Sequence, residues 1–378
     1  MQVCLFVGTL SIGGAERQVL VLANALVGRG HTVDLITFYD ASPRALGIEI
    51  DPRVRLTGLN GPARTSVVGR CLQLMAAPAR LRRLVRARGP DRVYSMLHLC
   101  NLVAWLATRG REREKLVWGY RASNMRLNWK RRVPERLCRL VSGSVPLMIA
   151  NSETGRRHAL DVAGWRPRRS VVVPNGIDTG VYRPRPEAGA AIRAELGLAQ
   201  DALVVGTVGR IDPMKGHEIF LKAAVELVRA GHAWTFVIVG GGCADRTANL
   251  RAQAEELGLK DRMHFTGVRS DTPALYSAMD IYCSASAYGE GFPNVIAEAM
   301  ACGTPCVVTN IGDSAAIVDG LGKVVPPNDP IGLRDALSEL AAQSAQCNAG
   351  SLRRHIEKHF SVDALVATTV AALRGPID

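Results

Sequence analysis

Two carboxylates, Glu290 and Glu298, have seven residues between them in the stretch YCSASAYGEGFPNVIAEAMACGTPCVV, residues 282–308. Good helix formers follow Gly-Phe-Pro-Asn, and Gly303 and Pro305 end that run, so we expect Glu290 on a loop and Glu298 on the helix behind it. The amide groups that open a helix are unpaired and lie at the positive end of its dipole, which suits an anion. One carboxylate before the helix and one along it fit a ligand that has hydroxyl groups at its two ends and phosphates between them, as in a nucleotide sugar. A bare pair of glutamates is more often solvated surface charge.

Two cations occupy a second loop that follows a predicted strand. The segment GRIDPMKGHE comes after the strand pattern of residues 203–208 and carries Arg210 and Lys215. Guanidinium and ammonium groups at the carboxyl end of a strand are placed to bind a pyrophosphate. Two basic residues in a loop are, taken alone, more often simply exposed to solvent.

Strands and helices alternate along the whole chain, which predicts an α/β fold built from two Rossmann-like halves. The first strand, residues 3–7, leads into a loop with Gly13 and Gly14, which would let a ligand approach the backbone or would simply make a tight turn. We expect an N-terminal domain over residues 1–174, a linker over 175–186 and a C-terminal domain over 187–360. A final amphipathic helix is expected over residues 362–373.

Composition narrows the class of protein. The chain has 378 residues, a hydrophobic fraction of 47% and a net charge of +13, which suits a globular protein with anionic partners. Aromatic residues are only 5% and do not alternate with basic ones, which argues against nucleic acid. The nine cysteines lack any CxxC spacing and suggest buried thiols in a reducing compartment. No apolar run has the length of a membrane span, and the start MQVCLFVG lacks the basic region of a signal peptide, so a cytoplasmic protein is expected.

Two basic segments suggest contact with an anionic membrane. A helix predicted over residues 72–88 contains arginines at 80, 82, 83, 86 and 88, and a second cluster contains Lys130, Arg131, Arg132 and Arg136 beside Trp129. Such stripes can lie on anionic lipid, and they are equally often a solvated helix face.

The central stretch closely resembles the EGFPxxxxEAMAxGxPVV signature of the retaining family 4 glycosyltransferases with the GT-B fold. GGAERQVLVLANAL near the start, Pro-Asn-Gly-Ile-Asp at the linker and Gly-Arg-x5-Lys-Gly in the second half extend the likeness over most of the chain. The resemblance implies two Rossmann-like domains facing a central cleft, with acceptor on the first and nucleotide sugar on the second. It also implies that the C-terminal helix, 361–378, packs back on the first domain. One departure is Ala315 and Ala316, where most relatives carry a glutamate.

The resemblance also implies roles for individual residues. The catalytic group would comprise Glu290, His98, Arg210 and Lys215. The donor site would comprise Gly13, Gly14, Arg210, Lys215, Val268, Glu290, Gly291, Phe292, Asn294, Val295 and Glu298. Arg121 and Asn124 resemble an acceptor-side loop. His98 could equally be a capping or core-edge histidine. No Asp-x-Asp pair with a cleft context is present, so no metal and no cofactor are expected.

The expected activity is transfer of a sugar from a nucleotide sugar to a saccharide or lipid-linked saccharide, with retention of anomeric configuration, in cell-surface polysaccharide or glycolipid assembly. The expected location is the cytoplasm, with the inner face of the membrane as a candidate surface. Two alternatives are a nucleotide-sugar 2-epimerase on the same fold and a non-catalytic nucleotide-sugar-binding protein. Neither glycine cluster after residue 236 forms GxGxxG, so the fingerprint of a nicotinamide site is lacking.

Overall fold

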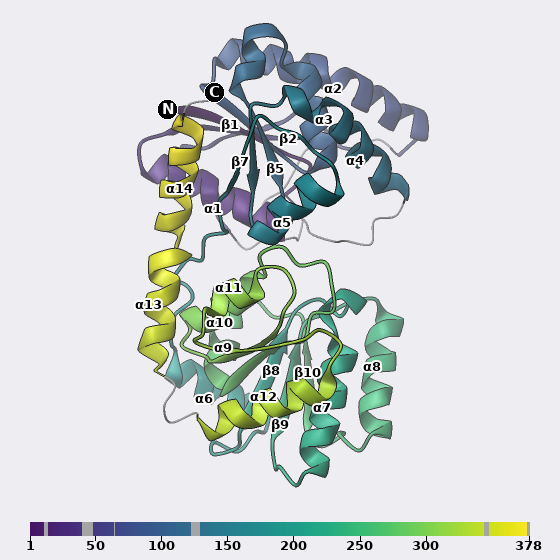
Figure 1. Cartoon of the computed structure of the whole chain (residues 1–378), viewed down its shortest axis with the longest axis vertical. Helices are drawn as coiled ribbons and strands as arrows, with labels where there is room; N and C mark the ends of the chain where they lie inside the picture. The colour runs from purple at the N-terminus through teal and green to yellow at the C-terminus, as the bar shows by residue number, and fades with distance from the viewer. Residues whose placement is uncertain (11–13, 40–47, 64, 122–128, 344–347, 376–378) are drawn as a thin grey trace. The chain divides into compact units, whose positions relative to one another are not determined.

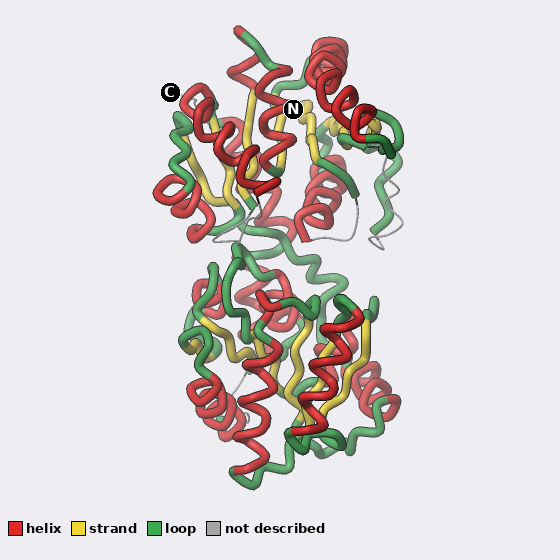
Figure 2. Tube along the Cα trace, turned by 90° about the vertical axis from the view of Figure 1, so that its right-hand side faces the viewer, coloured by secondary structure: helices red, strands yellow, loops and turns green. Residues whose placement is uncertain are grey.

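The computed structural model describes residues 1–10, 14–39, 48–63, 65–121, 129–343 and 348–375. The chain forms two compact units, one of residues 1–176 with 362–378 and the other of residues 177–361. Each unit contains one parallel sheet with helices on both faces, as Figures 1 and 2 show. The prediction of two Rossmann-like α/β halves is therefore confirmed.

Unit 1 contains a seven-stranded sheet in the order β3-β2-β1-β4-β5-β6-β7. Every neighbouring pair is parallel. The strands are β1 (Gln2–Val7), β2 (Thr32–Thr37), β3 (Arg55–Gly58), β4 (Arg92–Met96), β5 (Leu116–Tyr120), β6 (Leu147–Ala150) and β7 (Arg169–Val172).

Two apolar layers cover the sheet of unit 1. Helices α1 (Gly14–Gly28) and α14 (Val362–Arg374) pack on one face, where Leu20, Leu26 and Leu365 are buried. On the other face lie α2 (Val67–Arg88), α3 (His98–Ala107), α4 (Trp129–Val141) and α5 (Glu153–Arg157). The short turns η2 (Gly110–Lys115), η3 (Ser142–Ser144) and η4 (His158–Val162) complete the unit.

Unit 2 contains a six-stranded parallel sheet in the order β10-β9-β8-β11-β12-β13. Its strands are β8 (Val204–Val208), β9 (Thr235–Val239), β10 (Met263–Gly267), β11 (Ile281–Ser284), β12 (Cys306–Thr309) and β13 (Lys323–Val325). One face is covered by α6 (Pro186–Glu195), α9 (Thr272–Ala278), α10 (Asn294–Ala301), α11 (Ser314–Val318) and α13 (Ala349–His359). The other is covered by α7 (His217–Arg229), α8 (Ala244–Glu256) and α12 (Pro330–Ala342), and η5 (Pro213–Lys215) precedes α7.

One helix boundary differs clearly from the one that the sequence pattern predicts. The helix expected from Leu72 begins at Val67, because the Ser66 hydroxyl accepts the Gly69 amide N–H at 3.1 Å and caps the first turn. Among the described residues, Cys71 and Cys243 are exposed, so the expectation of buried thiols is wrong for these two, whereas the buried group comprises Cys4, Cys100, Cys138, Cys283, Cys302 and Cys306. In the described part of the chain, no helix has both the length and the apolar character needed to cross a bilayer.

Candidate active site

The strand order of unit 2 brings two loops together at one edge of its sheet. Strand β8 lies between β9 and β11, so the chain leaves β8 on one side and returns through β11 on the other. Ligands of open α/β sheets bind at such a reversal, beyond the carboxyl ends of the strands. The loop after β8 carries Arg210 and Lys215, and the loop after β11 carries Glu290.

Backbone contacts hold these two loops against each other. The Ala287 amide N–H donates to the Met214 carbonyl at 2.8 Å. Gly216 adopts a left-handed conformation with φ 64°, and a Cβ atom there would lie 1.9 Å from the Ala285 carbonyl oxygen. A side chain at this position would therefore force the loops apart.

We predict that Gly216→Ala lowers both the melting temperature and the affinity for nucleoside diphosphate. The added methyl group meets backbone, which cannot rotate away, and the positive φ adds strain of about 1 kcal/mol or more. Gly231→Ala is the matched control, since φ is 90° there but no atom lies within 4 Å of the added Cβ. Thermal unfolding and calorimetric titration check the pair, and equal behaviour of the two variants would contradict the loop contact.

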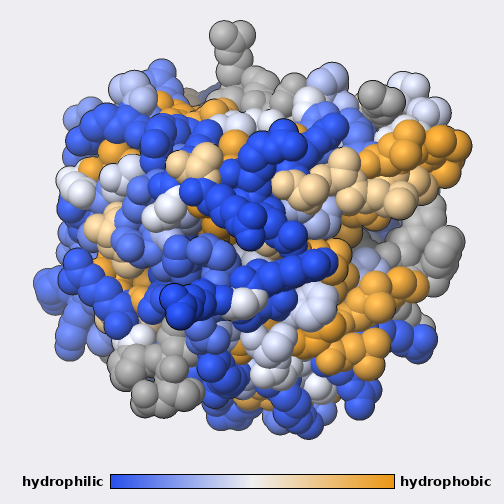
Figure 3. Space-filling model, turned by 90° about the horizontal axis from the view of Figure 1, so that it is seen from above, coloured by the Kyte–Doolittle hydropathy of each residue, from blue (hydrophilic) through white to orange (hydrophobic). Residues whose placement is uncertain are grey.

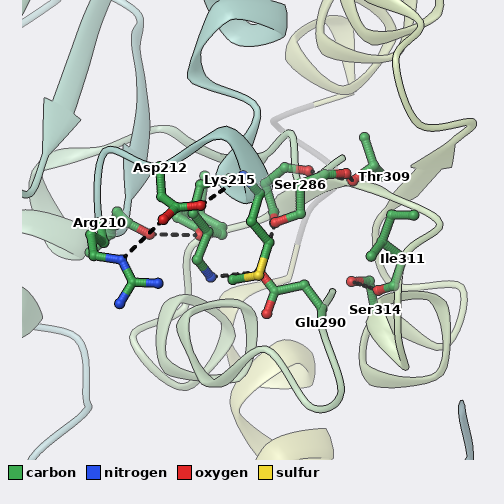
Figure 4. A network of polar contacts seen from close by, with 12 residues as sticks. Arg210, Asp212, Lys215, Ser286, Glu290, Thr309, Ile311 and Ser314 are labelled. Atoms are coloured by element: carbon green, nitrogen blue, oxygen red, sulfur yellow. Dashed lines mark hydrogen bonds and ion pairs between the residues drawn. The ribbon is translucent and has the colours of Figure 1, made fainter. Parts of the chain in front are cut away.

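A charged network lies where the two loops meet (Figure 4). The Lys215 ammonium Nζ donates to Glu290 Oε1 at 2.6 Å, and the Ser286 hydroxyl donates to the same oxygen at 2.8 Å. Glu290 is only 7% exposed, so this carboxylate is stabilised by its partners rather than by bulk water. The arrangement presents a cation and an anion side by side at the edge of the sheet.

Arg210 lies at the start of the same loop with its guanidinium largely in solvent. Its side chain is 65% exposed, and its Nε lies 3.6 Å from Asp212 Oδ2. The Asp212 side chain accepts the Met214 amide N–H at 3.0 Å, which fixes the turn before Lys215. Arg210 is therefore available to an anionic ligand at a smaller cost than Lys215, which is already paired.

Glu298 lies on the second turn of α10 and is 7% exposed. The Tyr276 hydroxyl donates to Glu298 Oε2 at 3.1 Å. Burial, reinforced by the Glu298 charge, raises the pKa of Tyr276 well above its usual range, so the phenol keeps its proton and remains a donor. The positions predicted for the two glutamates, Glu290 before the helix and Glu298 along it, agree with the bounds of α10.

The other predicted donor residues of unit 2 fall into two groups. Gly291 accepts the Asp313 amide N–H at 2.9 Å through its carbonyl, and the Phe292 ring packs against Phe360 with ring centroids 5.3 Å apart, so both take part in the structure of the loop. Asn294 and Val295 open α10 and are half-buried, whereas Val268 follows β10 and is 81% exposed.

In unit 1, the predicted residues follow the carboxyl ends of β1, β4 and β5. His98 opens α3 after Leu97, whose φ is 75°, and its ring contacts those of Tyr120 and Trp165 at centroid distances of 5.8 and 5.6 Å. Gly14 opens α1 and is exposed. Gly13 and Asn124 lie outside the described residues.

Arg121 follows β5 and is half-buried. Its Nη1 donates to Asn175 Oδ1 at 2.8 Å, while its Nε is buried without a hydrogen-bond partner in the described structure. Asn151 follows the neighbouring strand β6, and its Oδ1 is likewise buried and unpartnered there. One unused donor and one unused acceptor therefore lie at adjacent strand ends.

Several of these residues carry no signal in the sequence. Ser286 is one serine among many, and Tyr276 reaches Glu298 only because α9 packs beside α10. His217 is buried beside Lys215, and neither of its ring nitrogens has a hydrogen-bond partner in the part of the chain that the structure describes. Burial, followed by the Lys215 charge, lowers the pKa of His217 to about 4, so it stays neutral. Among the described residues, no group of three or more histidine, cysteine, aspartate or glutamate side chains is arranged to hold a metal ion.

Comparison with known proteins gives consistent results for both halves. Residues 12–181 match the family described as Glycosyltransferase Family 4, and residues 202–343 match Glycosyl transferases group 1. The D-inositol 3-phosphate glycosyltransferase of Kineococcus radiotolerans is 30% identical, over 92% of this chain and 86% of that protein. The enzyme of the same name from Salinispora tropica is 29% identical, over 95% and 80%.

Solved structures share the fold at lower identity. A glycosyltransferase from Rickettsia africae superposes with a TM-score of 0.83 at 18% identity, covering 99% of this chain and 98% of that one. Anabaena Alr3699/HepE in complex with UDP gives 0.80 at 22% identity, covering 99% of both chains. These likenesses confirm the predicted GT-B fold.

Proposed function

The chain is a member of glycosyltransferase family 4, and on that basis we propose that it transfers a sugar from a nucleoside diphosphate sugar to an acceptor hydroxyl with retention of anomeric configuration. The observation that carries the proposal is the Lys215–Glu290 pair at the sheet edge of unit 2, 2.6 Å apart. A cation meets the diphosphate and an adjacent carboxylate meets the sugar hydroxyls.

The leaving diphosphate is stabilised by this chain's own groups. Lys215 and Arg210 supply positive charge, and the amide groups that open α10 supply hydrogen bonds at the positive end of the helix dipole. These groups oppose the charge that develops on the phosphate oxygen as the bond to the anomeric carbon breaks. We propose that the reaction needs no metal ion.

The anomeric configuration is retained if the acceptor hydroxyl attacks the anomeric carbon on the same face from which the phosphate leaves. A bond forms between the acceptor oxygen and the anomeric carbon, the bond from that carbon to the phosphate oxygen breaks, and this oxygen takes the proton of the acceptor hydroxyl. Glu290 orients the sugar ring, and a catalytic role is also proposed for His98. This sequence of events rests on membership of the family.

The acceptor is proposed to be a saccharide or a lipid-linked saccharide, used in cell-surface polysaccharide or glycolipid assembly at the cytoplasmic face of the membrane. Relatives named for D-inositol 3-phosphate add a small phosphorylated polyol to the acceptors that need testing. The buried Nε of Arg121 favours an acceptor that carries an anionic group, because it is a charged donor that has no hydrogen-bond partner among the described residues.

Glu298 is proposed to accept hydrogen bonds from the ribose. We predict that Glu298→Gln lowers affinity for nucleotide sugar and for free nucleoside diphosphate alike, by roughly 1.5–3 kcal/mol or about 10- to 150-fold. Tyr276→Phe is the control, because it keeps the carboxylate and removes only the 3.1 Å hydrogen bond that orients it. In calorimetric titration, Glu298→Gln should lose more nucleotide affinity than Tyr276→Phe. Normal nucleotide binding by Glu298→Gln would refute the assignment.

The activity itself is tested by incubating the protein with a panel of nucleotide sugars, with and without a mixed acceptor pool. A glycosyltransferase forms a glycosylated acceptor and releases nucleoside diphosphate. An epimerase forms an isomerised nucleotide sugar without any acceptor, and a binding protein forms neither. Either of these two results would overturn the proposed function.

A further inference from the structure

Three outer helices of unit 1 expose a group of apolar side chains to solvent. In the first turns of α2, four apolar side chains are largely exposed: Val67 at 71%, Val68 at 70%, Leu72 at 55% and Met75 at 77%. Scattered exposed apolar residues are ordinary, but a contiguous group of them marks an interaction site. This part of α2 buries only Gly69 and Gln73 before Ala77.

A second apolar stripe lies on α4. Val133, Leu137 and Leu140 are 52%, 46% and 79% exposed. Their spacing places them on one side of the helix. Helix α3 packs against both α2 and α4 and adds Leu106, which is 39% exposed. The exposed apolar residues of α2, α3 and α4 are called the apolar face below.

The charge around the apolar face has one sign. Helix α2 carries six arginines and no acidic residue, and α4 carries five basic residues against Glu135. Figure 3, which looks onto unit 1 from above, shows apolar side chains on the side where Figure 1 draws α2 and α4, with hydrophilic ones between them. A face that is apolar and basic together matches an anionic lipid surface.

Not every arginine of α2 is available to lipid. Arg82 donates to the carbonyl oxygens of Leu106 and Ala107, at 2.6 and 2.8 Å, and Arg88 donates to Asp34 and Thr57, both at 2.8 Å. Arg83 and Arg86 are exposed on the last turns. The side chains of Lys130, Arg131 and Arg132 lie outside the described part of the chain.

We propose that the apolar face inserts among the headgroups of an anionic bilayer, with Arg83 and Arg86 on the phosphates. A second copy of the chain is the rival occupant, but pairing this face with itself would bring two arginine-rich, acid-poor α2 helices together, which like-charge repulsion opposes. The inference deepens the proposed function, because it identifies the surface through which the enzyme reaches an acceptor held in a membrane.

Sedimentation of the full chain with vesicles tests the proposal. Binding to vesicles of phosphatidylglycerol and phosphatidylcholine is expected to exceed binding to pure phosphatidylcholine and to fall as salt rises. Leu72→Asp/Met75→Asp is expected to lower vesicle affinity about tenfold or more through lost burial. Ile331→Asp, at a 45% exposed apolar position in unit 2, should leave it unchanged.

Two double variants that remove the same charge isolate the contribution of the basic residues to vesicle binding. Arg83→Gln/Arg86→Gln should weaken binding to anionic vesicles roughly 30-fold, since each of the two basic residues contributes about 1 kcal/mol near the surface. Lys222→Gln/Lys260→Gln removes the same charge from exposed positions of unit 2 and should have little effect. Melting temperature and nucleoside diphosphate affinity, measured for every variant, show that the fold and the unit 2 site are intact.

Three results would overturn the proposal. These are equal binding to neutral and anionic vesicles, vesicle binding by Leu72→Asp/Met75→Asp equal to that of the unaltered chain, and a dimer in light scattering that this variant dissociates. All three readouts are independent of turnover, so a failure of the transferase assay would leave this test interpretable.

Discussion

Replacing Glu290 by glutamine is expected to lower kcat about a hundredfold or more while nucleoside diphosphate binding survives. The carboxylate lies before α10, beside the cation assigned to the phosphates, so in our proposal it meets the transferred sugar near the bond that breaks. A contact that strengthens in the transition state affects turnover more than ground-state binding. Glutamine also removes the charge that neutralises Lys215, so affinity for the free diphosphate should stay equal or rise.

Ser286→Ala is the matched variant for this prediction. It removes the 2.8 Å hydrogen bond to Glu290 Oε1 but keeps the carboxylate and its 2.6 Å ion pair with Lys215. Its turnover should fall much less than that of Glu290→Gln. Steady-state kinetics with calorimetric titration measure both, and wild-type turnover in the glutamine variant would remove Glu290 from the reaction.

Lys215→Ala is expected to weaken nucleoside diphosphate binding roughly 10- to 150-fold and to destabilise unit 2 at the same time. The binding loss comes from the missing charge on the phosphates. The stability loss, about 3 kcal/mol, comes from leaving the buried Glu290 carboxylate without its cation. Arg210→Ala should weaken binding without lowering stability, because its guanidinium is 65% exposed.

The double variant Lys215→Ala/Glu290→Gln separates the two effects. Removing the unpaired carboxylate charge should restore most of the melting temperature but none of the diphosphate affinity. Additive losses of stability in the double variant would show that the ion pair does not couple the two residues. Unchanged diphosphate affinity in both Lys215→Ala and Arg210→Ala would refute the phosphate assignment.

Much of the site in unit 2 could be predicted because its signals are local. Helix formers after Gly-Phe-Pro-Asn, with Gly303 and Pro305 behind them, predict α10 and therefore the different settings of Glu290 and Glu298. The strand pattern that ends before Arg210 is also a local signal, and it predicts that Arg210 lies on a loop at the carboxyl end of a strand. The alternation of strands and helices likewise sufficed for the fold.

The direct pairing of Lys215 with Glu290 could not be predicted in that way. The two residues are 75 positions apart, and they meet because β8 and β11 are neighbours, which depends on the order of strands in the sheet. The hydrogen bond from Tyr276 to Glu298 likewise depends on tertiary packing, of α9 beside α10, whereas Ser286 reaches Glu290 within one loop, four residues away. Residue type alone does not carry this information.

The apolar face shows a different limit. The periodic pattern predicts a helix from Leu72, yet α2 begins at Val67 and exposes its first apolar residues instead of burying them. A hydrophobic pattern is normally taken to mark the core, so it cannot distinguish a buried stripe from an apolar surface. The arginines were visible in the sequence, whereas the apolar residues that accompany them became apparent only from their exposure.

The anomeric configuration of the product distinguishes the proposed retaining transfer from its alternatives. The unaltered chain is incubated with a panel of nucleotide sugars and a pool of lipid-linked saccharides and phosphorylated polyols, and any glycosylated product is analysed by proton NMR. The account predicts a glycosidic bond with the same anomeric configuration as the donor, formed by the unaltered chain and lost in Glu290→Gln. An inverted linkage, or an isomerised nucleotide sugar formed without an acceptor, would contradict it.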